Sequence, residues 1–406
     1  MKITHVEVIP IFPRLAERYE DRKVDLYGID HRLVYKVHTD NGLIGYGDTR
    51  VRPGGTYSNA DLEHLIGRDP CDFINNSRFK GDQMGGAFYD VVGKHLEVPA
   101  YKLMGGEKVR EAVKVAAWTR PASPEHFRSE VLRAADQGYM VFKMHSCSHH
   151  DVIEQTRMAE EVAPEGFKLH WDFNGRRTLA AALPLVKQLE RDHPIVGFVE
   201  DPIMRTDLDG WRMLREQTGI PIVLHVPKLG GLHEVLHRAA DIFMISAGGE
   251  GLARGIAYSQ LNMQTIIQDG ASTLGKALAL HTAAVLGTAD GHSINLDDQY
   301  EEDYTTETIP VIEGFSPVPE GIGLGFEVDE DALARMAANK PIEQPRFVGI
   351  LHMPGGHTFY GPGQVAPYGE EGTVRGFRTE LWEEDGSSEF ERIYERVQQE
   401  GRIPAE

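Results

Sequence analysis

The sequence has very little cysteine and no excess of positive charge. Only two of its 406 residues are cysteines, so a disulfide-stapled scaffold is excluded and free thiols in a reducing cytoplasm are expected. One of them, Cys147, has no identifiable base, so a nucleophilic role is not indicated. The formal net charge is −20, whereas surfaces that bind nucleic acid or anionic membranes need a basic excess. An anionic substrate would therefore need positive charge supplied locally, by a metal ion or by placed lysines and arginines.

Long apolar runs are also missing. No stretch approaches the length of a membrane span, and the first residues open an alternating strand without the apolar core of a signal peptide. No Gly-rich phosphate-binding turn follows the first strand, so the sequence has no dinucleotide-binding fingerprint. These absences predict a cytoplasmic protein with neither a membrane nor a nucleic acid as partner.

Residues 1–110 are expected to form an α+β domain. The segment Leu33–Tyr46 contains an Asn-Gly pair between two alternating apolar runs, which is the strongest short signal for a β-hairpin. Residues 59–104 have the apolar spacing of helix. The segment Pro13–Asp30 has no strong periodicity, and a loop of that length inside a compact domain is usually functional or disordered.

From Val113 onward the sequence alternates about eight times between short apolar strands and helices, at intervals of about 25 residues. This rhythm predicts an α/β fold in which residues 111–325 form a modified (β/α)8 barrel of the TIM type, with a doubly wound open sheet as the structural alternative. Residues 326–406 are expected to return in part to the first domain and to carry an extension of unknown role. Within them we predict a loop over Met353–Tyr368 and a charged, exposed helix over Ser388–Glu400.

Three successive predicted strands end in polar side chains. Alternate residues of a strand share a face, so Lys143 and His145 point the same way. Asp172 and Asn174 do the same at the end of the next strand, and Glu200 ends the third. The carboxyl ends of parallel barrel strands meet on one face, where barrel enzymes keep their chemistry. Each end could be polar only because it meets solvent, but three in succession favour one shared site.

The stretches Ala87–Lys94 and Val98–Gly106, followed by the strand ends at Asp172 and Glu200, resemble the enolase superfamily in its mandelate racemase and muconate lactonizing enzyme branch. The resemblance covers about residues 1–330. It implies a capping domain that closes over a modified barrel, and a homo-oligomer. It also implies Mg²⁺ and removal of the proton α to the carboxylate of a small-molecule substrate, with the metal stabilising the enediolate that forms.

By this resemblance Asp172 and Glu200 are metal ligands, with Asn174 beside them as a substrate-binding residue. Carboxylate oxygens suit a hard divalent cation, although Asp172 could instead cap the following helix. Family members usually end the fifth barrel strand with a metal-binding glutamate, but here the matching position falls on His225 or Val226. Valine cannot bind a metal, and imidazole suits Zn²⁺ or Fe²⁺ better than Mg²⁺. Either His225 or water fills the third place, or metal binding is weak.

The resemblance makes Lys143 the base on the second barrel strand or a cation that binds the substrate carboxylate. A nearby divalent metal lowers the proton affinity of a lysine, as a base at neutral pH requires. His145 is a variant that orients the substrate or acts as base itself. The family base on the sixth strand is missing. Asp269, after the seventh, is a second catalytic candidate, although a carboxylate before Gly270 often only starts a loop. Asp297, after the eighth, matches a family acid.

Good candidates for a base are present only on the Lys143 side of the site. This fits loss of water better than racemisation, which needs a base on each face of the substrate carbon. The sequence therefore predicts a lyase, an acid-sugar dehydratase in which Lys143 or His145 removes the α-proton and an acid, His225 or His145, assists loss of the β-hydroxyl. The alternatives are an isomerase (racemase, epimerase or cycloisomerase) and a catalytically silent member that binds a small acid. Candidate substrate contacts in exposed segments that close over the site in the family are Tyr19, Arg22 and Arg50.

Overall fold

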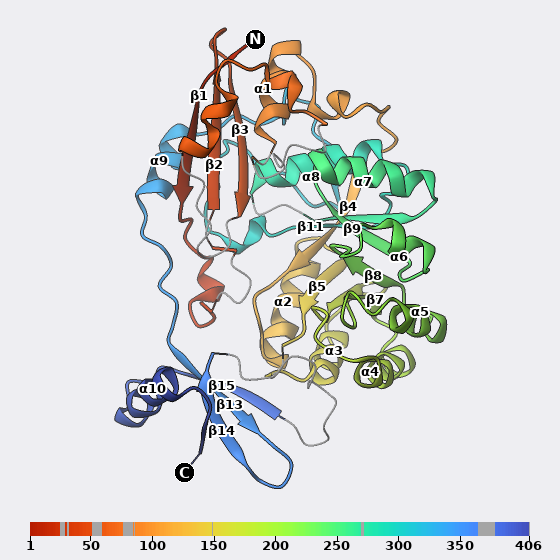
Figure 1. Cartoon of the computed structure of the whole chain (residues 1–406), viewed down its shortest axis with the longest axis vertical. Helices are drawn as coiled ribbons and strands as arrows, with labels where there is room; N and C mark the ends of the chain where they lie inside the picture. Colours follow the sequence, from red (N-terminus) through yellow and green to blue (C-terminus); the bar gives the residue numbers. More distant parts are fainter. Residues whose placement is uncertain are drawn as a thin grey trace. The chain divides into compact units, whose positions relative to one another are not determined.

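The computed structural model describes residues 1–24, 29–30, 32–50, 59–75, 84, 86–147, 149–268, 272–363 and 378–405, without the side chains of 59–61 (Figure 1). The chain divides into two compact units. The first comprises Met1–Thr119, Gln137–Val141 and Ile242–Ile342, and the second comprises Arg120–Asp136, Phe142–Asp241 and Glu343–Glu406.

The N-terminal region is an antiparallel sheet of β1 (Ile3–Ile11), β2 (Arg32–Thr39) and β3 (Ile44–Arg50). The predicted hairpin is confirmed, and Gly42 takes a φ of 83°, a left-handed conformation that glycine adopts without steric cost. The helical reading of residues 59–104 is right only in part. In the described part of this range the structure has the longer helix α1 (Ala87–Leu96) and short 3₁₀ turns at Asn59–Leu65, Pro70–Asp72 and Ala100–Met104.

Eight parallel strands form the predicted barrel. Their order in the sheet follows the chain from β4 to β11, and β11 pairs with β4, so the sheet is closed. A doubly wound sheet would have two open edges, and that alternative is therefore wrong. The strands are β4 (Ala112–Trp118), β5 (Val141–His145), β6 (Lys168–Asp172), β7 (Val196–Glu200), β8 (Ile222–His225), β9 (Ile242–Ser246), β10 (Gln264–Gln268) and β11 (Ser293–Ile294).

Helices follow the strands, as the alternating pattern predicts. Several begin at a side-chain cap: the carboxylate of Asp151 accepts hydrogen bonds from two backbone N–H groups of α3, and Ser272 caps α8. No helix among the described ranges is long and apolar enough to cross a membrane. The helices are α2 (Pro124–Asp136), α3 (Val152–Glu160), α4 (Leu179–Asp192), α5 (Leu208–Gln217), α6 (Leu232–Leu236), α7 (Gly249–Gln260) and α8 (Thr273–Val285).

After the barrel, β12 (Phe315–Pro317) pairs antiparallel with β4, and α9 (Glu330–Ala338) returns to the N-terminal sheet. The carbonyl oxygen of Met336 accepts a hydrogen bond of 3.1 Å from the backbone N–H of Phe12, directly after β1.

A separate four-stranded antiparallel sheet occupies the C-terminal region, in the order β15-β13-β14-β16, with helix α10 (Ser388–Glu400). The predicted loop over Met353–Tyr368 is wrong in part, because the β-prone run that begins at Thr358 pairs with β13; its residues 364–368 lie outside the described residues. The predicted helix is present but is not simply exposed, since it buries an apolar stripe that includes Phe390 and Val397. The strands are β13 (Phe347–His352), β14 (Thr358–Pro362), β15 (Arg378–Glu383) and β16 (Ile403–Pro404).

Candidate active site

The ends of β5, β6 and β7 bring one lysine and two carboxylates together in the second unit. The Nζ atom of Lys143 lies 3.1 Å from Oδ2 of Asp172 and 2.8 Å from Oε2 of Glu200. Asp172 and Glu200 are direct neighbours in the register of β6 and β7. All three residues are almost completely buried, at 1%, 2% and 0% exposure. The three strand ends that the sequence singles out therefore form one cluster.

Three histidines surround the two carboxylates. The Nε2 atom of His145 lies 3.0 Å from Oδ2 of Asp172, and Nδ1 of His225 lies 3.2 Å from Oε1 of Glu200. The sequence reasoning missed the third, His170, whose Nε2 is 2.9 Å from Oε2 of Glu200. His170 precedes Asp172 by two residues, so strand alternation places it on the same face. That spacing was the signal that could have identified it.

Electrostatics keep the lysine and both carboxylates charged. Burial alone lowers the pKa of Lys143, but the negative charges of Glu200 and Asp172 outweigh burial and raise it. Burial would raise the pKa of Glu200, but Lys143 and hydrogen bonds from the neighbouring histidines hold it well below its usual range. The pKa of Asp172 is also lowered, because Lys143 and His145 outweigh burial and the charge of Glu200. Burial lowers the pKa of His145, which keeps its imidazole neutral.

A third buried carboxylate, Asp201, lies directly after β7 and was also missed. Its Oδ2 accepts a hydrogen bond of 2.7 Å from Nε of Arg205, and its Oδ1 accepts one of 3.0 Å from the backbone N–H of His225. Burial, followed by the charges of Glu200 and Asp172, raises the pKa of Asp201 to about 7. Asp201 thus links the ends of β7 and β8 and is already engaged by a guanidinium group.

After β6, β7 and β8 the chain turns through residues with positive φ. These are Asn174 (54°), Asp201 (44°) and Val226 (53°), respectively. The predicted shared face of Asp172 and Asn174 is wrong for this reason, because β6 ends at Asp172 and Asn174 lies in the turn. The backbone N–H of Asn174 instead donates a hydrogen bond of 2.8 Å to Oδ1 of Asp172. Asp172 caps its own turn and not α4, whose N-cap residue is Thr178.

The carboxylate oxygens of this cluster fit a hard divalent cation, provided that the ammonium group of Lys143 does not occupy them. Asp172 and Glu200 offer adjacent ionised carboxylates, the ligand type that Mg²⁺ prefers. One ligand atom each from Glu200, Asp201 and His225 also lies within 4.8 Å of the others. The ammonium group of Lys143, however, already contacts both carboxylates. A cation could therefore bind them only when Lys143 moves away or loses its proton.

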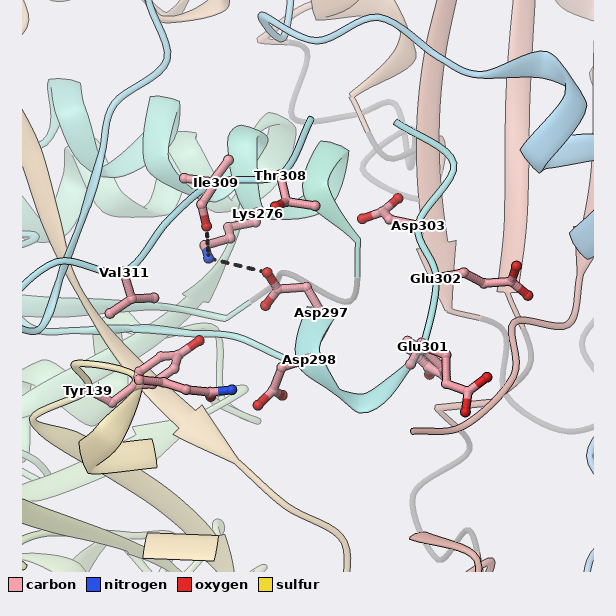
Figure 2. Close-up of a pocket in the computed structure, with 12 residues that line it drawn as sticks. Tyr139, Lys276, Asp297, Asp298, Glu301, Glu302, Asp303, Thr308, Ile309 and Val311 are labelled. Atoms are coloured by element: carbon pink, nitrogen blue, oxygen red, sulfur yellow. Dashed lines mark hydrogen bonds and ion pairs between the residues drawn. The ribbon is translucent and has the colours of Figure 1, made fainter. Parts of the chain in front are cut away.

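Asp297 belongs to the first unit. It begins the 3₁₀ turn Asp297–Gln299, and its Oδ2 lies 3.2 Å from Nζ of Lys276, a buried residue of α8 that the sequence reasoning did not consider (Figure 2). Lys276 also donates a hydrogen bond of 2.9 Å to the carbonyl oxygen of Ile309. Both side chains line a cavity of about 300 Å³, and several further carboxylates also line it. Asp269 lies outside the described residues.

The three candidate substrate contacts occupy different environments in the first unit. Tyr19 is not an exposed loop residue, because it is fully buried and its hydroxyl group lies 3.1 Å from Oγ1 of Thr119. The guanidinium group of Arg22 lies 5.0 Å from the centre of the Tyr19 ring. Arg50 is exposed at the end of β3. A role for these residues in substrate binding stays a prediction.

The chain is similar in sequence to D-galactonate dehydratases. It is 26% identical to the enzyme of Pectobacterium atrosepticum over 230 residues, which is 49% of this chain and 59% of that one. It is 27% identical to the enzyme of Verminephrobacter eiseniae over 226 residues, 48% of this chain and 58% of that one. The chain thus spans less than two thirds of the length of these relatives.

Solved structures share the fold at lower identity. A dipeptide epimerase from Cytophaga hutchinsonii, in complex with Mg and a dipeptide, matches with a TM-score of 0.69 and 21% identity over 83% of this chain and 98% of that one. A muconate cycloisomerase from Pseudomonas fluorescens matches with a TM-score of 0.68 and 19% identity over 82% and 98%. A family model described as "Enolase C-terminal domain-like" matches residues 126–332, half of the chain. The chain therefore belongs to the enolase superfamily, in the branch that carries the mandelate racemase and muconate lactonizing enzyme C-terminal domain.

Proposed function

We propose that this protein is an acid-sugar dehydratase, which removes the α-proton of a sugar-acid carboxylate and then loses the β-hydroxyl group as water. The observation that carries the proposal is the position of Lys143, whose Nζ lies within 3.1 Å of both Asp172 and Glu200. A potential base beside two potential ligands of a cation is the arrangement that proton abstraction next to a carboxylate requires. The similarity to D-galactonate dehydratases supports a polyhydroxy acid as substrate.

The proposed cofactor is Mg²⁺, held by Asp172, Glu200 and either His225 or water. When bound, it neutralises the negative charge that develops on the substrate carboxylate. The Mg-bound dipeptide epimerase with the same fold supports this choice. Two buried ionised carboxylates fit the hard cation, whereas the imidazole of His225 fits a borderline cation such as Zn²⁺ better.

The chain's own residues supply the proton transfers. Lys143 takes the α-proton on Nζ, which requires a neutral amine. The negative charges of Asp172 and Glu200 hold its pKa up, so neutralising those carboxylates lowers the pKa and makes the amine available as base. The electron pair of the broken C–H bond forms the new C=C bond as the C–O bond to the β-hydroxyl breaks. His145, or His225 where water is the third metal ligand, must first be protonated to the imidazolium form. It then gives that hydroxyl a proton, and the enol becomes the keto acid.

One observation favours a different function. Lys143 already neutralises the two carboxylates, and the fifth barrel strand ends in His225 and Val226, which supply no carboxylate. A protein of this kind could bind a small organic acid through its lysine and histidines without catalysing a reaction. This catalytically silent binder is the second candidate.

The deciding experiment begins with the metal content of the purified protein. It continues with a screen of sugar acids, including D-galactonate, for keto-acid formation in the presence of Mg²⁺. A dehydratase binds one divalent ion per site and converts at least one acid, and Lys143→Arg, which keeps the charge but cannot serve as a base near neutral pH, abolishes turnover. Incorporation of solvent deuterium into recovered substrate without keto acid would indicate an isomerase. Acid binding without metal at millimolar Mg²⁺, Mn²⁺ or Zn²⁺ would favour the silent binder.

A further inference from the structure

A turn directly after β5 gathers three side chains with metal-ligating atoms. The backbone N–H of His150 donates a hydrogen bond of 3.2 Å to the carbonyl oxygen of Cys147, which closes the turn. The rings of His149 and His150 lie 4.4 Å apart between their centres. The sulfur of Cys147 and one ring nitrogen of each histidine all lie within 4.8 Å of one another.

The three side chains are largely withdrawn from solvent. Cys147 is 2% exposed, and His149 and His150 are half-buried. A thiolate and neutral imidazoles are the forms of these groups that bind metals.

One ring nitrogen in the cluster lacks the partner that a buried polar atom normally has. The Nδ1 atom of His149 is shielded from solvent and has no hydrogen-bond partner in the part of the chain that the structure describes. An unsatisfied buried nitrogen is destabilising, so such atoms are uncommon in folded proteins. A bound cation would satisfy it.

We propose that Cys147, His149 and His150 bind a transition-metal ion, preferentially Zn²⁺. This site is separate from the carboxylate cluster, because neither Asp172 nor Glu200 is one of its ligands. One thiolate and two imidazoles form a borderline-soft donor set that selects Zn²⁺ over Mg²⁺. In a tetrahedral Zn²⁺ site the bonds to sulfur and nitrogen are about 2.3 and 2.1 Å long, which places the ligand atoms about 3.5 Å apart. Water completes the fourth position.

The turn is tied to the candidate active site through backbone and side-chain hydrogen bonds. The backbone N–H of Ser146 donates a hydrogen bond of 2.8 Å to the carbonyl oxygen of Asp172, and Oγ of Ser146 accepts one of 3.2 Å from Arg177. His145 directly precedes this residue and contacts the carboxylate of Asp172. An ion at Cys147 would therefore restrain the segment that positions His145.

Cobalt titration tests the site directly, because a thiolate bound to Co²⁺ gives a charge-transfer absorption that oxygen and nitrogen ligands do not. The full-length protein, stripped of metal and then saturated with Mg²⁺, is titrated with Co²⁺. We expect the band to saturate at one Co²⁺ per chain and to disappear on addition of Zn²⁺. Cys147→Ser abolishes the band, and the matched control Cys71→Ser, at an exposed cysteine, keeps it. His149→Gln and His150→Gln each weaken Co²⁺ binding at least about tenfold.

Further variants separate this site from the carboxylate cluster. Asp172→Asn with Glu200→Gln leaves the band in place, because neither residue is a ligand of the proposed site. If the buried Cys147→Ser variant does not fold, X-ray absorption of the Zn²⁺-loaded wild-type protein replaces it, with one sulfur neighbour expected. The proposal is overturned by a zinc shell of nitrogen and oxygen alone, by a band that survives Cys147→Ser, or by the absence of any band at millimolar Co²⁺.

Discussion

The ammonium nitrogen of Lys143 lies 2.8 Å from Oε2 of Glu200, and both side chains are withdrawn from solvent. Removing charges from water is costly, and the cost is offset only while each charge keeps its partner. The site therefore depends on a cation between its carboxylates, whether that cation is the ammonium group or a metal ion.

Replacing Lys143 with methionine should destabilise the metal-free protein by about 3–5 kcal/mol, because it leaves two buried carboxylates without their cationic partner. Mg²⁺ should restore much of that loss, since it supplies the missing charge, while turnover stays reduced by at least about 100-fold. Thermal unfolding with and without Mg²⁺ measures the first effect. Lys187→Met, at an exposed ion pair with Glu190, is the control and should change stability little. Equal stabilisation of wild type and Lys143→Met by Mg²⁺ would contradict the prediction.

Asp172→Asn and Glu200→Gln should each weaken Mg²⁺ binding at least about tenfold, because each removes a charged oxygen ligand. Isothermal titration with Mg²⁺ measures the change. The matched control is Asp209→Asn, at an exposed carboxylate of α5, which should bind Mg²⁺ as the wild type does. Unchanged Mg²⁺ affinity in both cluster variants would place the metal elsewhere.

His225 should decide which metal the site prefers. If its imidazole is the third ligand, His225→Glu should raise the affinity for Mg²⁺ relative to Zn²⁺, because a carboxylate is a harder donor. His225→Ala should then weaken the binding of Zn²⁺ more than the binding of Mg²⁺. Competition titrations with the two ions measure the ratio, with His237→Glu, at an exposed position, as control. If His225→Ala leaves both affinities unchanged, water fills the third place.

A buried histidine away from this cluster should make stability depend on pH. His281 of α8 is fully buried, and its Nε2 donates a hydrogen bond of 3.3 Å to the carbonyl oxygen of Leu324. Burial lowers its pKa from 6.5 to about 4. Between these two values the unfolded chain binds a proton that the folded chain does not, so stability falls as pH falls through that window. The full loss is roughly 3 kcal/mol near pH 4.

His281→Gln should remove this part of the pH dependence, because glutamine does not titrate. Urea unfolding of wild type and variant between pH 4 and pH 7 measures the difference. The exposed His95→Gln variant should keep the wild-type slope. Identical slopes for wild type and His281→Gln would show that His281 is protonated equally in the folded and unfolded chains.

The sequence was sufficient for the barrel and for the core of the candidate site because both depend on short-range periodicity. Strand alternation placed Lys143 and His145 on one face, and both contact Asp172 in the structure. The succession of strands brought Asp172 and Glu200 together, since consecutive parallel strands are neighbours in this barrel.

Periodicity carries no information on the direction in which the chain leaves a strand. Asp201 and Asn174 both follow a strand end, and both take a left-handed conformation that alternation does not describe. Asparagine and aspartate both tolerate that conformation better than most residues, so each position gave only a weak local hint. Lys276 was missed for another reason: it reads as an ordinary helical lysine, and its pairing with Asp297 depends on tertiary structure.

The C-terminal sheet with α10 assembles a hydrophobic core from its own residues, among them Val348, Phe390, Ile393 and Ile403. The family model ends at residue 332, before β13 begins. An element that supplies its own core needs no barrel residue to complete its packing. Changes confined to this C-terminal sheet should therefore leave the strand ends that hold Lys143, Asp172 and Glu200 in place.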